Sequence, residues 1–470
     1  MRRQVPNQAA WIAPARREAA RVAALAVLAA GAGVCLALNL PGHFSYDSVV
    51  QLAEGRTRSY GGEHPPVMSW LLGLADWVEP GAAPFVVFDV ALVYAALAGF
   101  VLATPRVSWL AAALAAALVA LPQLLIYPAV VWKDVLFAGA AVAGFAALAG
   151  AGRLWTSLRW RAASLLSALV LLSLATLARQ NGAVVLPFAA LAVGWIAAKR
   201  GVSGPRSLAS GLAFLAIAGL VVLGGSAALA TRLETGSALA DSWEALETYD
   251  IVAAAAREPG LDLAVLAKRA PWLERQVRVN GVRAYSPERI DTLDPLLAAY
   301  AGRGDVHGLI FDQWRELILR HPWLYLRVRW SAFRWVLTQP RPLDCVLIET
   351  GVDGPAGEMA VAGLKERDTQ RDDALAAYAM RFAGTPAYAH AGYGLVGALI
   401  LVFLLRRRRA EDIAAAAMLG AAFAFAASFA LISIACDYRY LYALDLAVIA
   451  AALYVAASAG VARSQAPADR

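Results

Sequence analysis

Long apolar runs separated by short polar stretches dominate the chain. Runs of about 17 to 25 residues carry almost no charge, which is the length an α-helix needs to cross roughly 30 Å of hydrocarbon. The pattern therefore predicts an all-α polytopic membrane protein with about ten transmembrane helices. The expected spans fall near residues 22–40, 84–104, 107–126, 134–150, 162–178, 183–198, 207–230, 389–405, 413–435 and 441–459.

One long segment has a different character. Residues 231–385 are mostly polar, with 19 Lys and Arg against 22 Asp and Glu, and Pro and Gly interrupt them repeatedly. We expect a mainly helical extracytoplasmic domain here, between a transmembrane module at 1–230 and a second one at 386–470. Within it, the stretch from Trp314 to Leu337 interleaves Trp, Leu and Tyr with Arg. That pattern suits either a helix lying on anionic headgroups or a buried amphipathic helix.

Basic residues set the expected orientation. With the N-terminus in the cytoplasm, the cytoplasmic segments carry 18 Lys and Arg, and the short outer segments carry five. Cytoplasmic loops of membrane proteins show such an excess. We therefore expect both termini on the cytoplasmic side of the cytoplasmic (inner) membrane and residues 231–385 outside. The apolar run after residue 21 is expected to stay as an anchor rather than to be removed as a signal peptide.

Composition narrows the class further. The 470 residues are 60% apolar, and their mean hydropathy is +0.57, well above that of soluble domains. The net charge of +7 lies mostly in short loops, where topology accounts for it, so no nucleic-acid partner is expected. Cys35, Cys345 and Cys436 form no metal or redox spacing, and we expect free thiols. Cys345 and Cys436 can pair only if both face the same aqueous side.

Polar residues that a membrane span does not need gather at the expected outer ends of the spans. They are Asp47, Glu63 and His64 in the first outer loop (41–83), then Lys133 and Asp134, Arg179, and Asp437 and Arg439. Ionisable groups at membrane depth are costly, and they normally line a cavity or pair with one another. We therefore expect a single charged pocket at the outer membrane surface.

The chemistry of this pocket can be sorted by sign. Lys133, Arg179 and Arg439 suit an anion such as a lipid phosphate or diphosphate. Asp47 offers a carboxylate that can take a proton from an attacking hydroxyl group. Glu63 and His64 are candidates to orient Asp47 or to hold a divalent metal, although two ligands do not make a metal site. No cofactor is required by the sequence, and a divalent metal remains an open possibility.

Each of these residues also has a plainer interpretation, which the sequence leaves open. Asp47 could cap the helix that follows it, where Ser45 and Ser48 would serve equally well. Lys133 and Asp134 could be interfacial charges, Arg179 could form a structural ion pair, and Arg439 could pair with Asp437. Tyr438, Tyr440 and Tyr442 are expected to belong to an aromatic belt, and Asp89 and Asp445 to internal pairs.

Three short motifs carry a resemblance to a known group. The first outer loop contains "SYDSVVQLAEG" and a "GEHPP" turn, and the start of the last span reads "DYRYLY". In order and sidedness they resemble membrane glycosyltransferases of the GT-C superfamily, nearest to bacterial GT-C-like proteins of unassigned specificity. More distantly, the chain is similar to protein O-mannosyltransferases and to the transferases that add aminoarabinose to lipid A.

The resemblance implies a sugar donor linked to polyprenyl phosphate or diphosphate, inversion at the anomeric carbon, and a glycan, lipid or protein acceptor. It implies that Asp47 is the general base and that Lys133, Arg179 and Arg439 bind the donor phosphate. Glu63, His64, Asp134 and Asp437 would shape the acceptor side or orient the catalytic groups. Many members carry two adjacent acidic residues in the first loop, whereas Ser48 follows Asp47 here. Metal dependence is therefore undecided.

Two other functions are compatible with the sequence. A transporter or flippase of lipid-linked sugars would also need an anion-binding cavity, together with broken helices near the bilayer centre; Pro122 and Pro187 lie in expected spans. A surface-polysaccharide polymerase or ligase would place its catalytic residues in 231–385, for example His307, Arg315 and His321.

Overall fold

The computed structural model describes residues 9–61, 64–230, 238–301, 303–407 and 409–459. Over these residues the chain is helical, and its only β-structure consists of isolated bridges. Nine helices of the described part are long and apolar enough to cross a membrane, and a bent pair makes a tenth candidate. The prediction of an all-α chain with about ten spans is confirmed.

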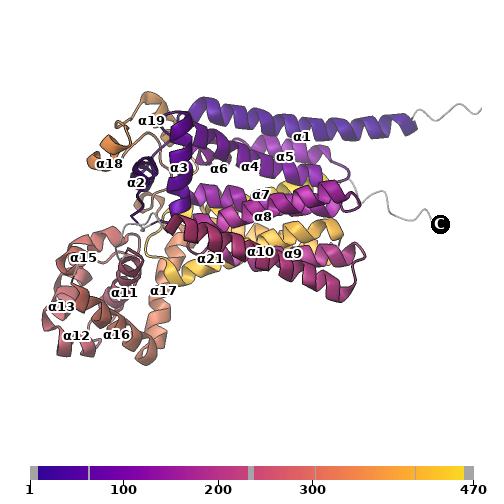
Figure 1. Ribbon diagram of the computed structural model, residues 1–470. Coiled ribbons are helices and arrows are strands. Elements are labelled where there is room, and N and C mark those ends of the chain that lie inside the picture. Colours follow the sequence, from indigo (N-terminus) through magenta and orange to yellow (C-terminus); the bar gives the residue numbers. More distant parts are fainter. Residues whose placement is uncertain (1–8, 62–63, 231–237, 302, 408, 460–470) are drawn as a thin grey trace, which may run out of the picture.

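The candidate spans lie side by side in one bundle (Figure 1). They are α1 (Ala9–Asn39), α4 (Ala83–Ala103), α7 (Lys133–Arg153), α8 (Leu158–Ala178), α9 (Val185–Lys199), α10 (Gly204–Ala230), α20 (His390–Arg407), α21 (Ile413–Ile432) and α22 (Tyr442–Ser458). Helices α7 and α22 are buried along most of their length, whereas α10 is mostly exposed at the bundle surface. In a chain of this composition, that surface is the one that lipid covers.

The expected span at 107–126 is broken, so the prediction of a continuous helix there was wrong. Helix α5 (Trp109–Leu118) is followed by α6 (Pro122–Leu125) and a short 3-10 turn to Ala129, and the two arms meet at 83°. Pro122 lacks the N–H that a continuing helix needs. Buried side chains donate hydrogen bonds to the backbone carbonyl groups that the break leaves unpaired. The donors are Tyr442 Oη to Gln123 O at 2.8 Å, Tyr94 Oη to Leu124 O at 3.0 Å and Asn39 Nδ2 to Leu125 O at 2.8 Å.

The segment 231–385 divides between two hydrophobic cores. Its first part, α11 (Ala238–Arg257), α12 (Ala264–Arg269), α13 (Pro271–Gln276), α14 (Val282–Ala284), α15 (Asp294–Tyr300) and α16 (Gly304–Arg320), surrounds a core of its own. Helix α17 (Pro322–Thr338) contributes Leu324 and Val328 to that core and Val336 to the core of the bundle. The remainder, with α18 (Ala356–Val361) and α19 (Gln370–Met380), packs on the bundle core beside α2 (Tyr46–Thr57) and α3 (Pro66–Val78).

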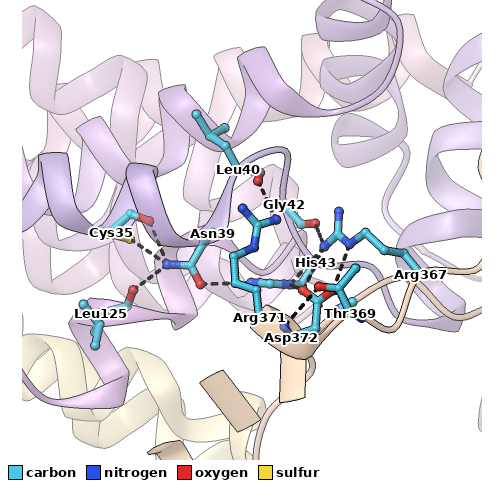
Figure 2. A network of polar contacts seen from close by, with 11 residues as sticks. Cys35, Asn39, Leu40, Gly42, His43, Leu125, Arg367, Thr369, Arg371 and Asp372 are labelled. Carbon is cyan, nitrogen blue, oxygen red and sulfur yellow. Dashed lines mark hydrogen bonds and ion pairs between the residues drawn. The ribbon is translucent and has the colours of Figure 1, made fainter. Parts of the chain in front are cut away.

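A buried polar network fastens the end of α1 to this last segment (Figure 2). His43 Nδ1 accepts the N–H of Gly351 at 2.9 Å, and His43 Nε2 donates to Asn39 Oδ1 at 2.9 Å. These two contacts define one neutral tautomer of the ring. Burial and the neighbouring Arg367 lower the pKa of His43 to about 4. Arg367 also donates to Gly42 O and pairs with Asp372, so the first loop and the segment before α19 hold each other.

A disulfide joins Cys345 to Cys436, which corrects the expectation of free thiols. Cys35 alone is free, and it is buried in α1. The bridge lies where Tyr438 N donates to Val346 O at 3.0 Å. Residues after Cys345 are therefore fixed against the start of the last span. Sequence spacing gave no sign of this pairing, because 91 residues separate the two cysteines.

The tyrosines of the last span are core residues, so their assignment to an aromatic belt was wrong for Tyr438 and Tyr442, both fully buried. Tyr442 stacks on Tyr127 with ring centroids 5.1 Å apart. Asp445 pairs with His390 and accepts the hydroxyl of Tyr438, as expected of an internal pair. Asp89 is buried as well, but no described residue donates a hydrogen bond to its carboxylate.

Candidate functional site

The charged residues singled out in the sequence meet at one end of the bundle. Helix α1 ends at Asn39, α7 begins at Lys133, α8 ends at Ala178, and the 3-10 turn before α22 begins at Tyr438. These ends lie beside α2, α3 and α17, opposite the end at which the described N-terminus of α1 lies (Figure 1). The topology thus delivers side chains from distant parts of the sequence to one place.

Asp47 lies in the first turn of α2, where the helix dipole favours a negative charge. The N-cap position belongs to Ser45, so the interpretation of Asp47 as a cap was wrong. Asp47 Oδ2 accepts a hydrogen bond from Arg439 Nη1 at 2.7 Å. Burial raises the pKa of Asp47, but His64, Arg439 and Lys133 together outweigh it and hold the pKa well below its usual range. The carboxylate is ionised at any physiological pH.

Helices α2 and α3 hold the first loop in shape by packing backbone against backbone. A Cβ atom on Gly55 would lie 2.2 Å from Ser69 O, and one on Gly73 would lie 2.4 Å from Gly55 O. Glu54 closes the same unit by accepting Gly61 N and Ser69 Oγ, both at 2.6 Å. Only glycine at the crossing allows this approach, which fixes Asp47 relative to the turn that carries His64.

His64 connects Asp47 with Lys133. Lys133 Nζ lies 2.6 Å from His64 Nδ1, and His64 Nε2 lies 3.7 Å from Asp47 Oδ1. When Lys133 is protonated, Nδ1 accepts its proton and the ring hydrogen lies on Nε2, facing Asp47. The 3.7 Å gap is longer than a hydrogen bond. Asp47 Oδ1 is therefore free to accept a proton from a bound molecule.

Arg439 lies between two carboxylates and two aromatic rings. Besides Asp47, it contacts Asp437, with Nε 3.2 Å from Oδ2. Its guanidinium carbon lies 5.3 Å from the Trp132 ring centroid and 5.6 Å from that of Tyr440. The local pair with Asp437 is thus real, and the longer-range pair with Asp47 adds to it. Burial raises the pKa of Asp437, against the effect of Arg439.

Arg179 and Asp134 form a buried ion pair next to this cluster. The side chain of Asp134 is 2% exposed and that of Arg179 is 8% exposed, so neither is an ordinary interfacial charge. The Arg179 guanidinium carbon lies 5.9 Å from the centroid of the Tyr440 ring that Arg439 also contacts. The structural pairing considered for Arg179 is therefore present.

Glu349 is a neighbour of this cluster that the sequence analysis missed. It lies between Val346, whose carbonyl accepts Tyr438 N at 3.0 Å, and Gly351, whose carbonyl accepts Phe44 N at 2.9 Å. The backbone between Val346 and Gly351 therefore runs from a position near Arg439 to one near Asp47. Burial and the nearby Asp353 raise the pKa of Glu349 to about 7, although Arg439 acts against them. An acid four residues after a cysteine gave no signal, because the disulfide that places it was not expected.

Other sequence candidates fall outside this cluster. Glu63 lies outside the described residues, so its relation to His64 is not placed. His307 pairs with Glu244 within the segment 231–385, at 3.0 Å. Among the described residues, no three His, Cys, Asp or Glu side chains come together to hold a metal ion.

The site can bind an anion at one flank and orient a hydroxyl group at the other. Lys133 and Arg439 supply positive charge, and the free oxygen of Asp47 supplies an acceptor. Together, the fold and the site define a multi-pass membrane protein with a cluster of oppositely charged side chains where its helices end.

Comparison with known proteins adds a distant likeness. No protein-family model and no curated protein matches the chain. An archaeal oligosaccharyltransferase, AglB from Archaeoglobus fulgidus solved with an inhibitory peptide and a dolichol-phosphate, matches at 15% identity and a TM-score of 0.41, over 92% of this chain and 50% of that one. The Archaeoglobus fulgidus oligosaccharyltransferase with Zn and sulfate matches at 15% identity and a TM-score of 0.40, over 93% and 49%. The chain spans about half the length of these enzymes, and a likeness at this level does not establish a common fold.

Proposed function

We propose that the protein is a membrane glycosyltransferase of the GT-C type, which moves a sugar from a polyprenyl-phosphate or polyprenyl-diphosphate donor to an acceptor hydroxyl. The observation that carries the proposal is the contact chain from Lys133 through His64 and Asp47 to Arg439. Its contact between Lys133 and His64 joins residues 69 positions apart in the sequence, and its contact between Asp47 and Arg439 joins residues 392 positions apart. It offers cations and a free carboxylate oxygen at the level where the membrane helices end.

The donor phosphate would bind at Lys133 and Arg439, with Arg179 contributing charge from the neighbouring ion pair. The anomeric C–O bond breaks, and the phosphate leaves with the bonding electron pair. A phosphate leaving group needs no proton, so fixed cations are sufficient to stabilise the charge that it gains. A lipid-linked donor also accounts for a site at the end of the spans, where a headgroup lies while its chain stays in the bilayer.

The acceptor would lie on the side of Asp47 and Glu349. Its hydroxyl oxygen attacks the anomeric carbon from the face opposite the phosphate, which inverts the configuration, and its proton passes to Asp47 Oδ1 as the general base. Arg439 holds the other oxygen of the same carboxylate, and His64 Nε2 lies 3.7 Å from Oδ1, which leaves that oxygen open to the acceptor. Asp134 and Asp437 hold Arg179 and Arg439 in place.

The distribution of basic residues supports a site on the outer face of the cytoplasmic membrane, and we propose that the reaction modifies the cell envelope. The acceptor is a glycan, a lipid or a protein. Glu63, the residue before His64 in the sequence, would help to shape the acceptor side.

The test is turnover of a radiolabelled polyprenyl-phosphate sugar by membranes that contain the full chain. Asp47→Asn keeps the shape and removes the charge, and we expect turnover to fall by about 10²-fold or more. Glu79→Gln, an exposed acid at the end of α3, is the matched control and should leave turnover unchanged. Full turnover by Asp47→Asn would contradict the assignment and favour a polymerase or ligase that works from 231–385.

A transporter of lipid-linked sugars is the second candidate, because of the bent pair Trp109–Leu118 and Pro122–Ala129 and the buried carboxylate of Asp89. Such a protein would bind the donor and show no sugar transfer in the wild type. Transfer of the labelled sugar to membrane acceptors by wild type, absent in Asp47→Asn, would exclude it.

A further inference from the structure

Helix α17 exposes a stripe in which tryptophan and arginine alternate. Trp323, Arg327, Trp330 and Arg334 follow one another at spacings of four, three and four residues, which places them on one helix face. Trp323 is 78% exposed and Trp330 is 59% exposed. The opposite face is buried in the core of the outer segment. These four residues are called the α17 stripe below.

The buried residue Arg329 fixes the position of the α17 stripe relative to the end of the membrane-spanning helix α21. Arg329 Nη1 donates to Leu431 O at 3.0 Å, and Arg329 Nη2 donates to Ser433 O, at the last turn of α21. Helix α17 lies across the end of the bundle rather than along it (Figure 1). It therefore lies at the level where an apolar span ends and lipid headgroups begin, which is where tryptophan is enriched in membrane proteins.

A cavity of about 280 Å³ opens on this stripe, lined by Arg257, Arg327, Trp330, Ser331 and Arg334. Arg257 uses Nη1 to donate to the carbonyl of Arg327 at 2.9 Å. Among the described residues, no carboxylate lies within ion-pair distance of Arg257 or Arg334. Glu258 is the acid at the rim, 4.0 Å from Arg327 Nη1. Three guanidinium groups thus face one small volume with a single weakly placed counter-charge.

We propose that Arg257, Arg327 and Arg334 bind the phosphate of an anionic phospholipid headgroup, with Trp330 against its glycerol end. Guanidinium groups bind phosphate oxygens in a bidentate manner, and a tryptophan at the interface covers the boundary between headgroup and acyl chain. The outer segment would then rest on the membrane surface through α17. This site is separate from the Asp47 cluster and does not depend on the proposed glycosyltransferase activity.

The test measures lipid retention by the full chain in detergent, using native mass spectrometry with phosphatidylglycerol or phosphatidylcholine added. We expect wild type to retain phosphatidylglycerol in preference. Arg334→Gln should weaken retention about fivefold, and Arg327→Gln with Arg334→Gln about 25-fold, since each basic residue near an anionic surface contributes about this factor. Glu258→Gln removes the competing acid and should strengthen retention.

Arg315→Gln, an equal change of charge at an exposed position of α16, is the matched control and should behave as wild type. Three results would overturn the proposal: equal retention of the two lipids, no loss in the double variant, or an equal loss in Arg315→Gln. Inorganic phosphate at millimolar concentration separates the two sources of the anion. Displacement of the lipid by phosphate alone would show a site for free phosphate instead of a headgroup.

Discussion

Two carboxyl groups of the site have pKa values shifted in opposite directions. Asp47 is surrounded by His64, Arg439 and Lys133, which lower its pKa despite burial. Glu349 is buried near Asp353 and only partly compensated by Arg439, and its pKa rises to about 7. Near neutral pH, the charge of Asp47 is therefore constant, whereas the charge of Glu349 depends on pH.

Ionisation of Glu349 should weaken donor binding. As the pH rises from 6 to 8, its carboxyl loses a proton and places a negative charge near Arg439, which competes with the donor phosphate. We expect the donor KM of wild type to rise about fivefold over this interval, with little change in kcat. Glu349→Gln should have a donor KM that stays low and flat. Initial rates at several donor concentrations across the pH range provide the measurement.

The opposite pattern would change the assignment of roles. If kcat rises with pH through about 7 and Glu349→Gln abolishes that rise, Glu349 and not Asp47 removes the acceptor proton.

The contribution of the Glu349 carboxyl to the free energy of unfolding has a definite sign. The folded state holds the proton more tightly than the unfolded state, so the contribution is full below pH about 4.5 and is lost as pH rises through about 7.

At the residue scale, the sequence analysis found its candidate residues by asking which polar side chains a membrane span does not need. Asp47, Lys133 and Arg439 stood out because an apolar span has no need of them, and the structure brings them together. The same argument could not find Glu349, because it lies in a polar segment in which acids are common. It also failed for Tyr438 and Tyr442, since a tyrosine near a span end looks the same in sequence whether it faces lipid or the core.

At the element scale, the crossing of α2 and α3 positions the loop that carries Asp47. Gly55→Ala would place a Cβ atom 2.2 Å from Ser69 O, a backbone atom that cannot move aside. We expect a loss of about 2 kcal/mol in stability, as for other overpacked contacts. Turnover should fall too, because Asp47 shifts relative to His64. Thermal unfolding and sugar-transfer assays measure the two effects.

Gly33→Ala is the control for this substitution. Gly33 lies within α1, and a Cβ atom there would meet nothing within 4 Å. Its stability should stay the same or rise by up to about 1 kcal/mol through helix propensity. Equal effects of the two substitutions would show that the close approach at Gly55 does not position the loop.

The disulfide holds the part of the site that carries Arg439, as the contact between Gly55 and Gly73 holds the part that carries Asp47. Cys345 and Cys436 close a loop with a sequence separation of 91 residues, for which chain entropy predicts a stabilisation of about 4 kcal/mol. The variant with both cysteines changed to alanine should unfold at a lower temperature than oxidised wild type. Reductant should lower the unfolding temperature of wild type and leave that variant unaffected; a reductant effect of equal size on both would show that the bridge is absent.

Elements were predicted well where a single rule decided them. Length and apolarity gave the spans, and α7, α8 and α22 begin or end within a few residues of the expected boundaries. The rule failed at 107–126, where the apolar run is long enough but Pro122 breaks it. The side chains that satisfy the break come from α1, α4 and α22, so nothing near Pro122 in sequence could have shown that a bent span is tolerated there.

At the scale of the whole molecule, the two ends of the bundle differ in charge and content. The end with the Asp47 cluster also holds α2, α3 and the segments from 231–385 (Figure 1). The opposite end holds the basic loops, such as that with Arg153, Arg159 and Arg161. The difference between the ends predicts that the site faces away from the cytoplasm.

Cysteine labelling in intact cells tests this orientation. Tyr46 is 63% exposed and lies next to Asp47, so Tyr46→Cys should react with a membrane-impermeant maleimide without permeabilisation. Thr156→Cys, at an exposed position of the basic loop between α7 and α8, should react only after permeabilisation. Background labelling should be low, because Cys35 is buried and Cys345 is bonded to Cys436. If Tyr46→Cys reacts only in permeabilised cells, the pocket faces the cytoplasm, and the proposal of a transferase on the outer face fails as a whole.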